Sequence, residues 1–245
     1  MSPRASGVHR AMVKLHDSCL RHIEIATTEL GASMEELLAL EADLAQWLEV
    51  ISWRVEAAQL RSAHRDFGLA FYALSSGLYR QAFSSLRSFL EVSIAAIYLS
   101  SAELKRRKWV SGALDISWSR LVSDDEDGIY SLAYVESFCP SAVNERIEFK
   151  VRLKAAYRRC SEFIHGNVTT SNLLPESIQY SAEFSAEWVA TAKKIILVVM
   201  HCLMVRYFEE LDEQSRYRIE GVLEERFPHL KSVRALLELP VEESE

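Results

Sequence analysis

Residues 69–104 read LAFYALSSGLYRQAFSSLRSFLEVSIAAIYLSSAEL, and this stretch decides the fold. Its apolar residues recur every three or four positions, a period that predicts one continuous helix. Because apolar side chains lie on nearly all sides of that helix, we expect it to be the central and most buried element. The positions that set the period are Leu78, Ala82, Phe83, Leu86, Leu90, Ile94 and Ile97.

The same period extends over most of the remaining chain, and no segment shows the alternation of a β-strand. Ser33 and Glu36 have the spacing of a capping box, which starts a helix. Residues 111–140 lose the period and include the acidic run 124–127, so we expect a long connection with short helical turns there. Helices are predicted over 8–30, closed by Gly31; over about 34–64, followed by a break at Asp66-Phe67-Gly68; over 140–165, closed by Gly166-Asn167; over 182–211; and in one or two pieces over 217–239.

These segments predict an all-α protein in three parts. Residues 1–64 are expected to form an N-terminal helical hairpin, residues 65–211 a helical bundle, and residues 212–245 a tail of short helices.

The composition is that of a soluble, compact chain. Of 245 residues, 49% are hydrophobic and 26% are charged, with only 8 Gly and 5 Pro, which excludes disordered and collagen-like proteins. The opening Met1-Ser-Pro-Arg resembles neither a signal nor a transit peptide, and the apolar run 195–205 is about half a bilayer span, so a cytoplasmic protein without membrane contact is expected. The four cysteines are far apart, which suggests neither zinc nor a disulfide framework, and no cofactor or metal is predicted.

Charge is distributed unevenly. The net charge of −7 argues against a surface that coats nucleic acid generally, but it leaves room for a local basic site. Six Arg or Lys residues lie between positions 146 and 165, on the predicted helix 140–165. One face of this helix is apolar, and the opposite face carries Lys150, Lys154, Arg158, Ser161 and His165.

Arg158 lies two turns before His165 and only about 20° away around the helix. Glu162, about 60° from His165, is the nearest acid. Lys150 and Lys154 continue the same face and are candidates to contact the phosphates of a nucleic acid.

The central helix carries a polar stripe of its own, which includes Arg87 and Glu91. Charged groups on so apolar a helix must find partners or line a wet groove. Two interpretations remain open: Arg87 and Glu91 form a buried structural pair, or they lie behind Arg158 or His165 and orient them.

Two motifs resemble the HEPN superfamily. The segment 157–166, Tyr-Arg-Arg-Cys-Ser-Glu-Phe-Ile-His-Gly, is similar to the Tyr-Arg-x-x-Ser-x-x-x-His-Gly motif of that superfamily, and residues 73–91 look like its Gly-Leu-Tyr-x-x-Ala…Leu-Arg-Ser-x-x-Glu helix. The resemblance covers about residues 69–211. It implies a helical bundle that dimerises so that two Arg/His pairs meet in one cleft, commonly used as a metal-independent endoribonuclease in toxin–antitoxin or antiviral systems. Many relatives are inactive or only bind nucleotides.

The chemistry of the Arg158 and His165 side chains fits the metal-independent RNA cleavage that the resemblance implies. RNA cleavage without a metal requires removal of a proton from a 2′-OH, stabilisation of the phosphorane and protonation of the 5′-oxygen. Histidine exchanges protons near neutral pH, and arginine offers a fixed charge and a donor fork to phosphate. Tyr157 and Ser161 are candidates to orient the ring or donate to phosphate; the alternative for Tyr157 is simple packing.

Other polar residues point less specifically to a function. Lys105, Arg106 and Arg107 are either a solvated helix end or a second contact to the RNA backbone. Trp109 and Trp118 nearby either stack on bases or anchor their loop.

The predicted function is a cytosolic, dimeric HEPN-like ribonuclease with RNA as substrate and an antitoxin or defence protein as a possible partner. The alternative is a non-catalytic HEPN-like module that binds a protein or a nucleotide. A third interpretation, a membrane-surface protein, rests only on the apolar run 195–205.

Overall fold

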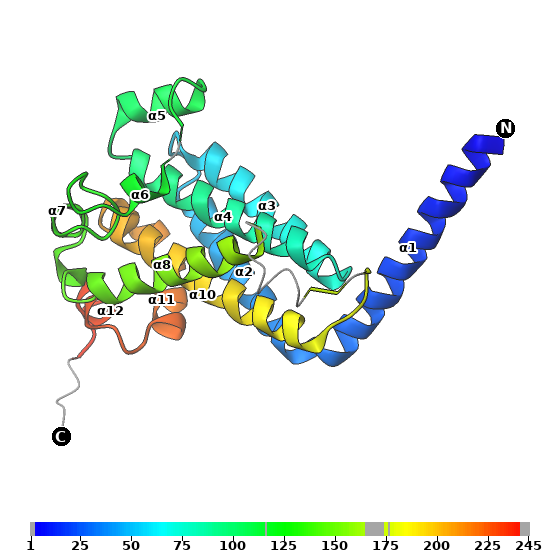
Figure 1. The fold of residues 1–245 in the computed structure, drawn as a ribbon. Coiled ribbons are helices and arrows are strands. Elements are labelled where there is room, and N and C mark those ends of the chain that lie inside the picture. Colours follow the sequence, from blue (N-terminus) through cyan, green and yellow to red (C-terminus); the bar gives the residue numbers. More distant parts are fainter. Residues whose placement is uncertain (1–2, 116, 165–173, 176, 241–245) are drawn as a thin grey trace.

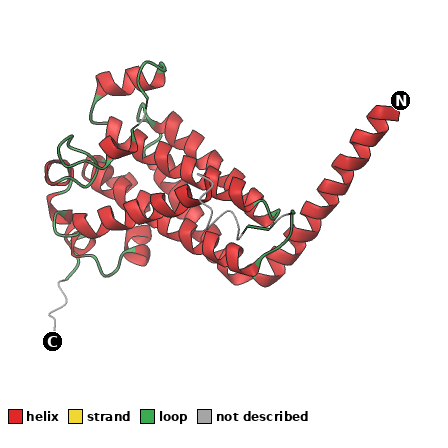
Figure 2. Ribbon diagram, viewed as in Figure 1, coloured by secondary structure: helices red, strands yellow, loops and turns green. Residues whose placement is uncertain are grey.

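The computed structural model describes residues 3–115, 117–164, 174–175 and 177–240, and over these residues it contains helices and loops without any strand (Figure 2). The all-α prediction is confirmed. The elements are α1 Pro3–Glu29, α2 Gly31–Val50, α3 Ala57–Ser75, α4 Tyr79–Leu99, α5 Glu103–Val110, α6 Trp118–Leu121, α7 Leu132–Phe138, the 3₁₀ helix η1 Pro140–Ala142, α8 Arg146–Ile164, α10 Ala182–Tyr207, the 3₁₀ helix η2 Phe208–Glu210, α11 Glu213–Arg226 and α12 Lys231–Leu236.

Helix α4 is central, as its sequence predicts. It packs against α3, α8 and α10, and its apolar side chains are buried (Figure 1). Phe83 of α4 stacks on Phe163 of α8 with ring centroids 3.7 Å apart and planes only 2° from parallel. This contact fixes the C-terminal half of α8 on the core.

The predicted helix over 69–104 is divided in two by Gly77. The N–H of Gly77 donates to the carbonyl of Leu74 at 2.9 Å, and the N–H of Leu78 donates to the carbonyl of Ala73 at 2.8 Å. These two bonds form a Schellman motif, which ends α3 and requires a left-handed residue at Gly77, where φ is 76°. The α3–α4 pair is therefore a helical hairpin instead of one long helix.

Replacement of Gly77 by alanine is expected to destabilise the protein by about 1–3 kcal/mol. Alanine is strained at this positive φ, and its Cβ would lie 3.1 Å from the carbonyl oxygen of Gln179. Gly68→Ala is the matched control, because this glycine lies inside α3 and its Cβ would meet nothing within 4 Å. Gly68→Ala is expected to stabilise by about 0.5–1 kcal/mol. Urea unfolding measures both; equal effects of the two substitutions would contradict the role of Gly77.

Other predicted boundaries were also wrong. The helix predicted to reach residue 104 ends at Leu99, and the helix predicted from residue 140 begins at Arg146, after the 3₁₀ helix η1. The helix predicted over 34–64 ends at Val50, and Asp66-Phe67-Gly68 lies inside α3. Gly31 begins α2 instead of closing α1.

Tertiary contacts explain the break after Val50. The carboxylate of Glu56 is fully buried, and it accepts hydrogen bonds from Tyr207 at 2.8 Å and from Arg54 at 2.9 Å. The domain boundary predicted after residue 64 also falls within α3, and α2 contributes to the same hydrophobic core as α4 and α10. The first two helices are thus continuous with the bundle.

Within the part of the chain that the structure describes, two helices are long and apolar enough to cross a membrane by length and composition: α4, and the segment Ala182–Glu210. In this fold, 67% and 78% of their apolar windows are buried inside the molecule. This burial is the pattern of core helices in a bundle.

Candidate functional site

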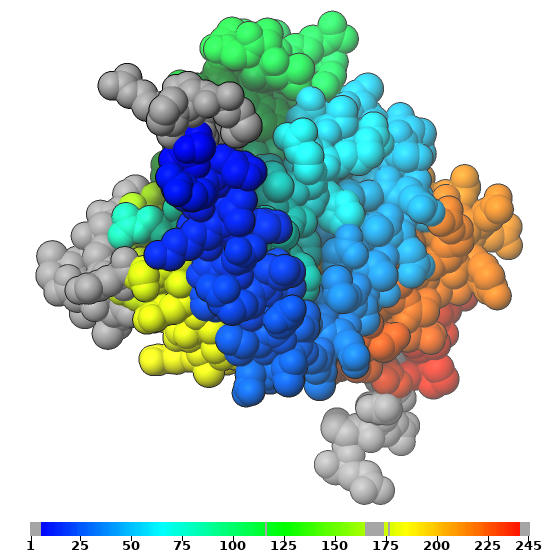
Figure 3. Space-filling model, turned by 90° about the vertical axis from the view of Figure 1, so that its right-hand side faces the viewer, coloured from blue at the N-terminus to red at the C-terminus, as the bar shows by residue number. Residues whose placement is uncertain are grey.

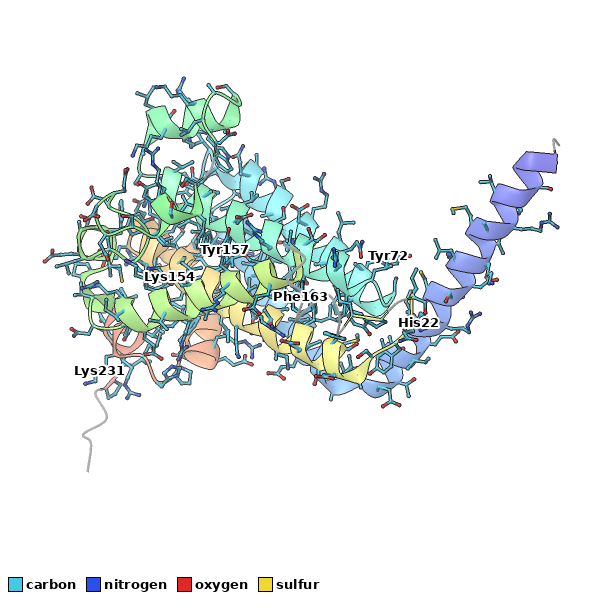
Figure 4. The ribbon with its side chains drawn as sticks, viewed as in Figure 1. His22, Tyr72, Lys154, Tyr157, Phe163 and Lys231 are labelled. Atoms are coloured by element: carbon cyan, nitrogen blue, oxygen red, sulfur yellow. The ribbon has the colours of Figure 1, made fainter. Side chains whose placement is uncertain are left out.

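The candidate site lies on α8, whose two faces match the predicted pattern with one exception. The apolar face is buried, and Lys154 and Arg158 on the other face are exposed. Figure 4 labels Lys154, Tyr157 and Phe163 along this helix. The buried apolar residues are Phe149, Leu153, Ala156, Cys160 and Phe163.

Lys150 is the exception. Its side chain is buried, and its Nζ lies 2.7 Å from an oxygen of Asp124 in the acidic connection. This ion pair lowers the pKa of Asp124, so that carboxylate remains charged at neutral pH. Lys150 therefore tethers the 124–127 loop to α8, which corrects the prediction that it contacts RNA. The sequence did not predict Asp124 as the partner, because a run of acidic residues does not indicate which helix it will contact.

Arg87 and Glu91 of α4 meet Tyr157 of α8. The Arg87 Nη2 donates to Glu91 at 3.1 Å and to the Tyr157 hydroxyl at 2.6 Å, and its guanidinium carbon lies 4.7 Å from the Tyr157 ring centre. Arg87 therefore binds an acid on its own helix and a hydroxyl on the neighbouring one. The two sequence motifs come together through these three side chains.

Trp118 and Ser161 complete the surroundings of Tyr157. The indole of Trp118 stacks on the Tyr157 ring with centroids 3.9 Å apart and planes 7° from parallel. Ser161 donates to the backbone carbonyl of Tyr157 at 2.8 Å. The tryptophan thus anchors α6 to α8, in agreement with the loop-anchor interpretation, and Ser161 is engaged with its own helix.

Two neighbouring groups are held neutral. Burial raises the pKa of the Tyr157 hydroxyl, and the nearby Glu91 carboxylate raises it further. Burial also raises the pKa of the Cys160 thiol to about 12, so this cysteine is not a thiolate nucleophile at neutral pH. Among these side chains, Tyr157 is a neutral hydrogen-bonding group and Cys160 belongs to the core.

Arg158 is the exposed cation of this region. Its side chain is 84% exposed, and it forms a long ion pair with Glu162, 3.6 Å from the Arg158 Nε. An exposed pair of this kind contributes at most about 1 kcal/mol. The guanidinium is therefore available to an incoming anion at little cost.

Arg159 is held differently. Burial lowers its pKa, but hydrogen bonds to Glu162 and to Glu187 of α10 raise it above the usual arginine value. Glu162 thus pairs with Arg159 as well as with Arg158. Glu187 was not expected from the sequence, because nothing in the α10 pattern distinguishes it from other surface acids.

His165 follows Ile164, the last residue of α8, and lies outside the described residues. Its role therefore rests on the sequence. His201 is buried in the core: its ring stacks on Phe149 with centroids 3.5 Å apart, and burial lowers its pKa.

The second basic segment lies apart from α8, on α5 at the edge of the molecule (Figure 1). Glu103 binds both Arg106 and Arg107, and Lys105 lies 4.0 Å from Glu126. Acidic side chains thus neutralise part of the positive charge of α5. This agrees with the interpretation that Lys105, Arg106 and Arg107 form a solvated helix end. Among the described residues, no three His, Cys, Asp or Glu side chains are arranged to hold a metal ion.

No family model, curated protein or solved structure matches this chain. The functional interpretation therefore depends on the residues and their geometry.

Proposed function

We propose that this protein is a metal-independent endoribonuclease of the HEPN type, acting in the cytoplasm as a toxin or antiviral-defence effector. Arg158 and His165 are the catalytic residues, and Arg87, Glu91 and Tyr157 position α8, which carries Arg158. The observation that carries the proposal is the hydrogen-bonded contact of Arg87 with Tyr157, because it joins the two segments whose sequences resemble that superfamily.

The exposure of Arg158 supports a role in binding phosphate. The weak pair with Glu162 leaves guanidinium donors available for two phosphate oxygens. In the proposed reaction the 2′-oxygen bonds to phosphorus as its proton leaves, and the 5′-oxygen departs and takes up a proton. Arginine stabilises the charge that develops on the phosphorane oxygens.

His165 is proposed to move the protons. One imidazole near neutral pH accepts or donates one proton at a time, and the reaction needs both a base and an acid. Two copies of the chain, related by a two-fold axis, supply one histidine for each role. The proposal therefore includes a dimer in which both copies contribute to one cleft.

The neutral phenol of Tyr157 has a supporting part. It is stacked on Trp118 and hydrogen-bonded to Arg87, so the turn of α8 that carries Arg158 is fixed to α4 and α6. Aligning a donor with the transition state costs less free energy when the donor is already held in place than when it is mobile.

The test is an incubation of the purified protein with a fluorescent single-stranded RNA in excess EDTA. The expected products carry a 2′,3′-cyclic phosphate and a free 5′-hydroxyl, which mass spectrometry identifies. An RNA in which every 2′-OH is replaced by 2′-O-methyl is the matched control and is expected to stay intact.

Cleavage that stops in EDTA, or cleavage of the methylated RNA, would overturn the mechanism. Binding of intact RNA or nucleotide without any cleavage would leave the chain as a non-catalytic binding module.

A further inference from the structure

A pocket lies between helix α5, the C-terminal end of α4 and the short helix α6. Helix α5 and the segment after it stand out at the top of the molecule, in green, in two views at right angles (Figures 1 and 3). The pocket has a volume of about 250 Å³. Pockets for drug-sized ligands enclose about 300–1,000 Å³, and a helix with its side chains is about 10 Å across. The pocket therefore suits a small molecule and not a peptide helix.

Helix α5, which forms one wall of this pocket, is weakly attached to the body. None of its eight residues is buried. Its half-buried Trp109 packs against the hydrophobic core, whereas Leu104 and Val110 are exposed. A helix this short is marginal in water by itself, so α5 depends on the few contacts that it makes. A molecule in the pocket would join α5 to α4 and α6 and add contacts that the helix lacks.

Most of the pocket wall is apolar. Leu99, Leu114 and Leu121 contribute aliphatic surface, and Tyr98 and Trp109 contribute aromatic side chains. Aromatic side chains make favourable offset or edge-on contacts with another ring. The wall therefore favours a ligand with a flat, aromatic body.

Charged side chains line the same pocket, and the cations outnumber the acids. Lys105, Lys108 and Arg120 are present together with Asp115 and Glu126. The Glu126 carboxylate lies 3.7 Å from Arg120 and 4.0 Å from Lys105, so two cations share one acid at distances too long for hydrogen bonds. These pairs are exposed and weak, and a new anion would displace little. The excess of positive charge favours a ligand with a negative group.

We propose that this pocket binds a small aromatic anion, with its ring against the apolar wall around Trp109 and its carboxylate or phosphate group among Lys105, Lys108 and Arg120. A ligand cation would meet three like charges there. The apolar contact supplies most of the affinity, because water screens exposed charges, and the cations select the sign of the ligand. This inference does not rest on the proposed ribonuclease activity.

Isothermal titration calorimetry of the full chain tests the class of ligand. The probes are indole-3-acetate, which carries a carboxylate, and 1-naphthyl phosphate, which carries a phosphate. Each is compared with a neutral counterpart that keeps the ring, 3-methylindole and 1-naphthol respectively. At least one anion is expected to bind at a single site, and its neutral counterpart at least about tenfold more weakly, because the hydrogen bonds to the charged group are lost.

Two substitutions on α5 are compared for their effect on this affinity. Lys108 and Arg107 are both exposed, and each loses one positive charge on replacement by alanine, but only Lys108 lines the pocket. Lys108→Ala is expected to weaken binding of the anion about tenfold, and Arg107→Ala by less than about threefold. Leu114→Trp places a large ring in the pocket and is expected to prevent binding. Thermal unfolding checks that each variant is folded.

Hydrogen exchange gives a second readout. The amides of α5 are expected to exchange more slowly when the anion is bound, because the ligand joins this helix to α4 and α6, while the amides of α11 exchange at an unchanged rate.

Four results would overturn the inference. These are no binding of either anion at millimolar concentration, neutral counterparts that bind as tightly as the anions, equal losses of affinity in Lys108→Ala and Arg107→Ala, and a folded Leu114→Trp protein that binds like the wild type. The last result would place the ligand elsewhere on the molecule.

Discussion

Arg158→Ala is expected to slow RNA cleavage by about 10²–10³-fold while leaving the fold intact, because the lost donors act on charge that develops in the transition state. The side chain is 84% exposed and makes only a long ion pair, so its removal is expected to change the free energy of unfolding by less than about 0.5 kcal/mol. Single-turnover cleavage in EDTA and urea unfolding measure the two quantities on the same preparation.

Lys154→Ala is the matched control for this prediction. Lys154 is an exposed cation on the same face of α8, about one turn before Arg158. Its loss is expected to weaken RNA binding modestly and to change the single-turnover rate at saturating protein by less than about threefold, since it contributes only to the general attraction of phosphate. Equal losses of rate for the two substitutions would mean that Arg158 has no special place in the reaction.

Phe163→Ala is expected to destabilise the protein by about 3–5 kcal/mol, the usual cost of removing a large aromatic side chain from a core. Phe163 is almost fully buried, stacks on Phe83 and meets Phe184 edge-on with ring centroids 6.1 Å apart. Its removal leaves a cavity where α8 packs against α4 and α10. The midpoint and slope of urea unfolding give the change in free energy.

The control for the core prediction is Tyr217→Ala on α11. This tyrosine is 77% exposed, so its loss is expected to stay within about 0.5 kcal/mol of the wild type. A Phe163→Ala protein as stable as Tyr217→Ala would contradict the packing described for α8.

The sequence was sufficient for the class of fold and for the buried apolar face of α8. Apolar residues repeat with the period of the helix where one face of that helix is buried. The sequence therefore predicts the apolar face of α8, which runs from Phe149 to Phe163. A pair between Arg87 and Glu91 is one of the two interpretations that the sequence leaves open, because residues four apart on a helix are neighbours, and the structure contains this pair.

Helix ends were less accessible from the sequence, because contacts between distant residues decide them. The break after Val50 depends on Glu56, whose carboxylate binds Tyr207 from the far end of the chain. The division at Gly77 has a local cause, a glycine at positive φ, but the apolar period continues across it and hides the turn.

The partners of charged groups could not be predicted for the same reason. The spacing places Lys150 on the polar face of α8, where it was predicted to contact RNA. In the structure it pairs instead with Asp124 of the acidic connection. Glu187 binds Arg159 across two helices that are separated in sequence. Spacing along one helix gives the direction of a side chain, whereas the element that it meets is set by the tertiary fold.

The most direct measurement of the central proposal is the single-turnover cleavage of a single-stranded RNA by His165→Ala in excess EDTA, compared with wild type at equal protein concentration. We expect a rate at least 100-fold lower, because proton transfer by a positioned histidine contributes about 10²–10⁴-fold, with unchanged RNA affinity and thermal midpoint. Cleavage by His165→Ala at the wild-type rate would contradict the proposal.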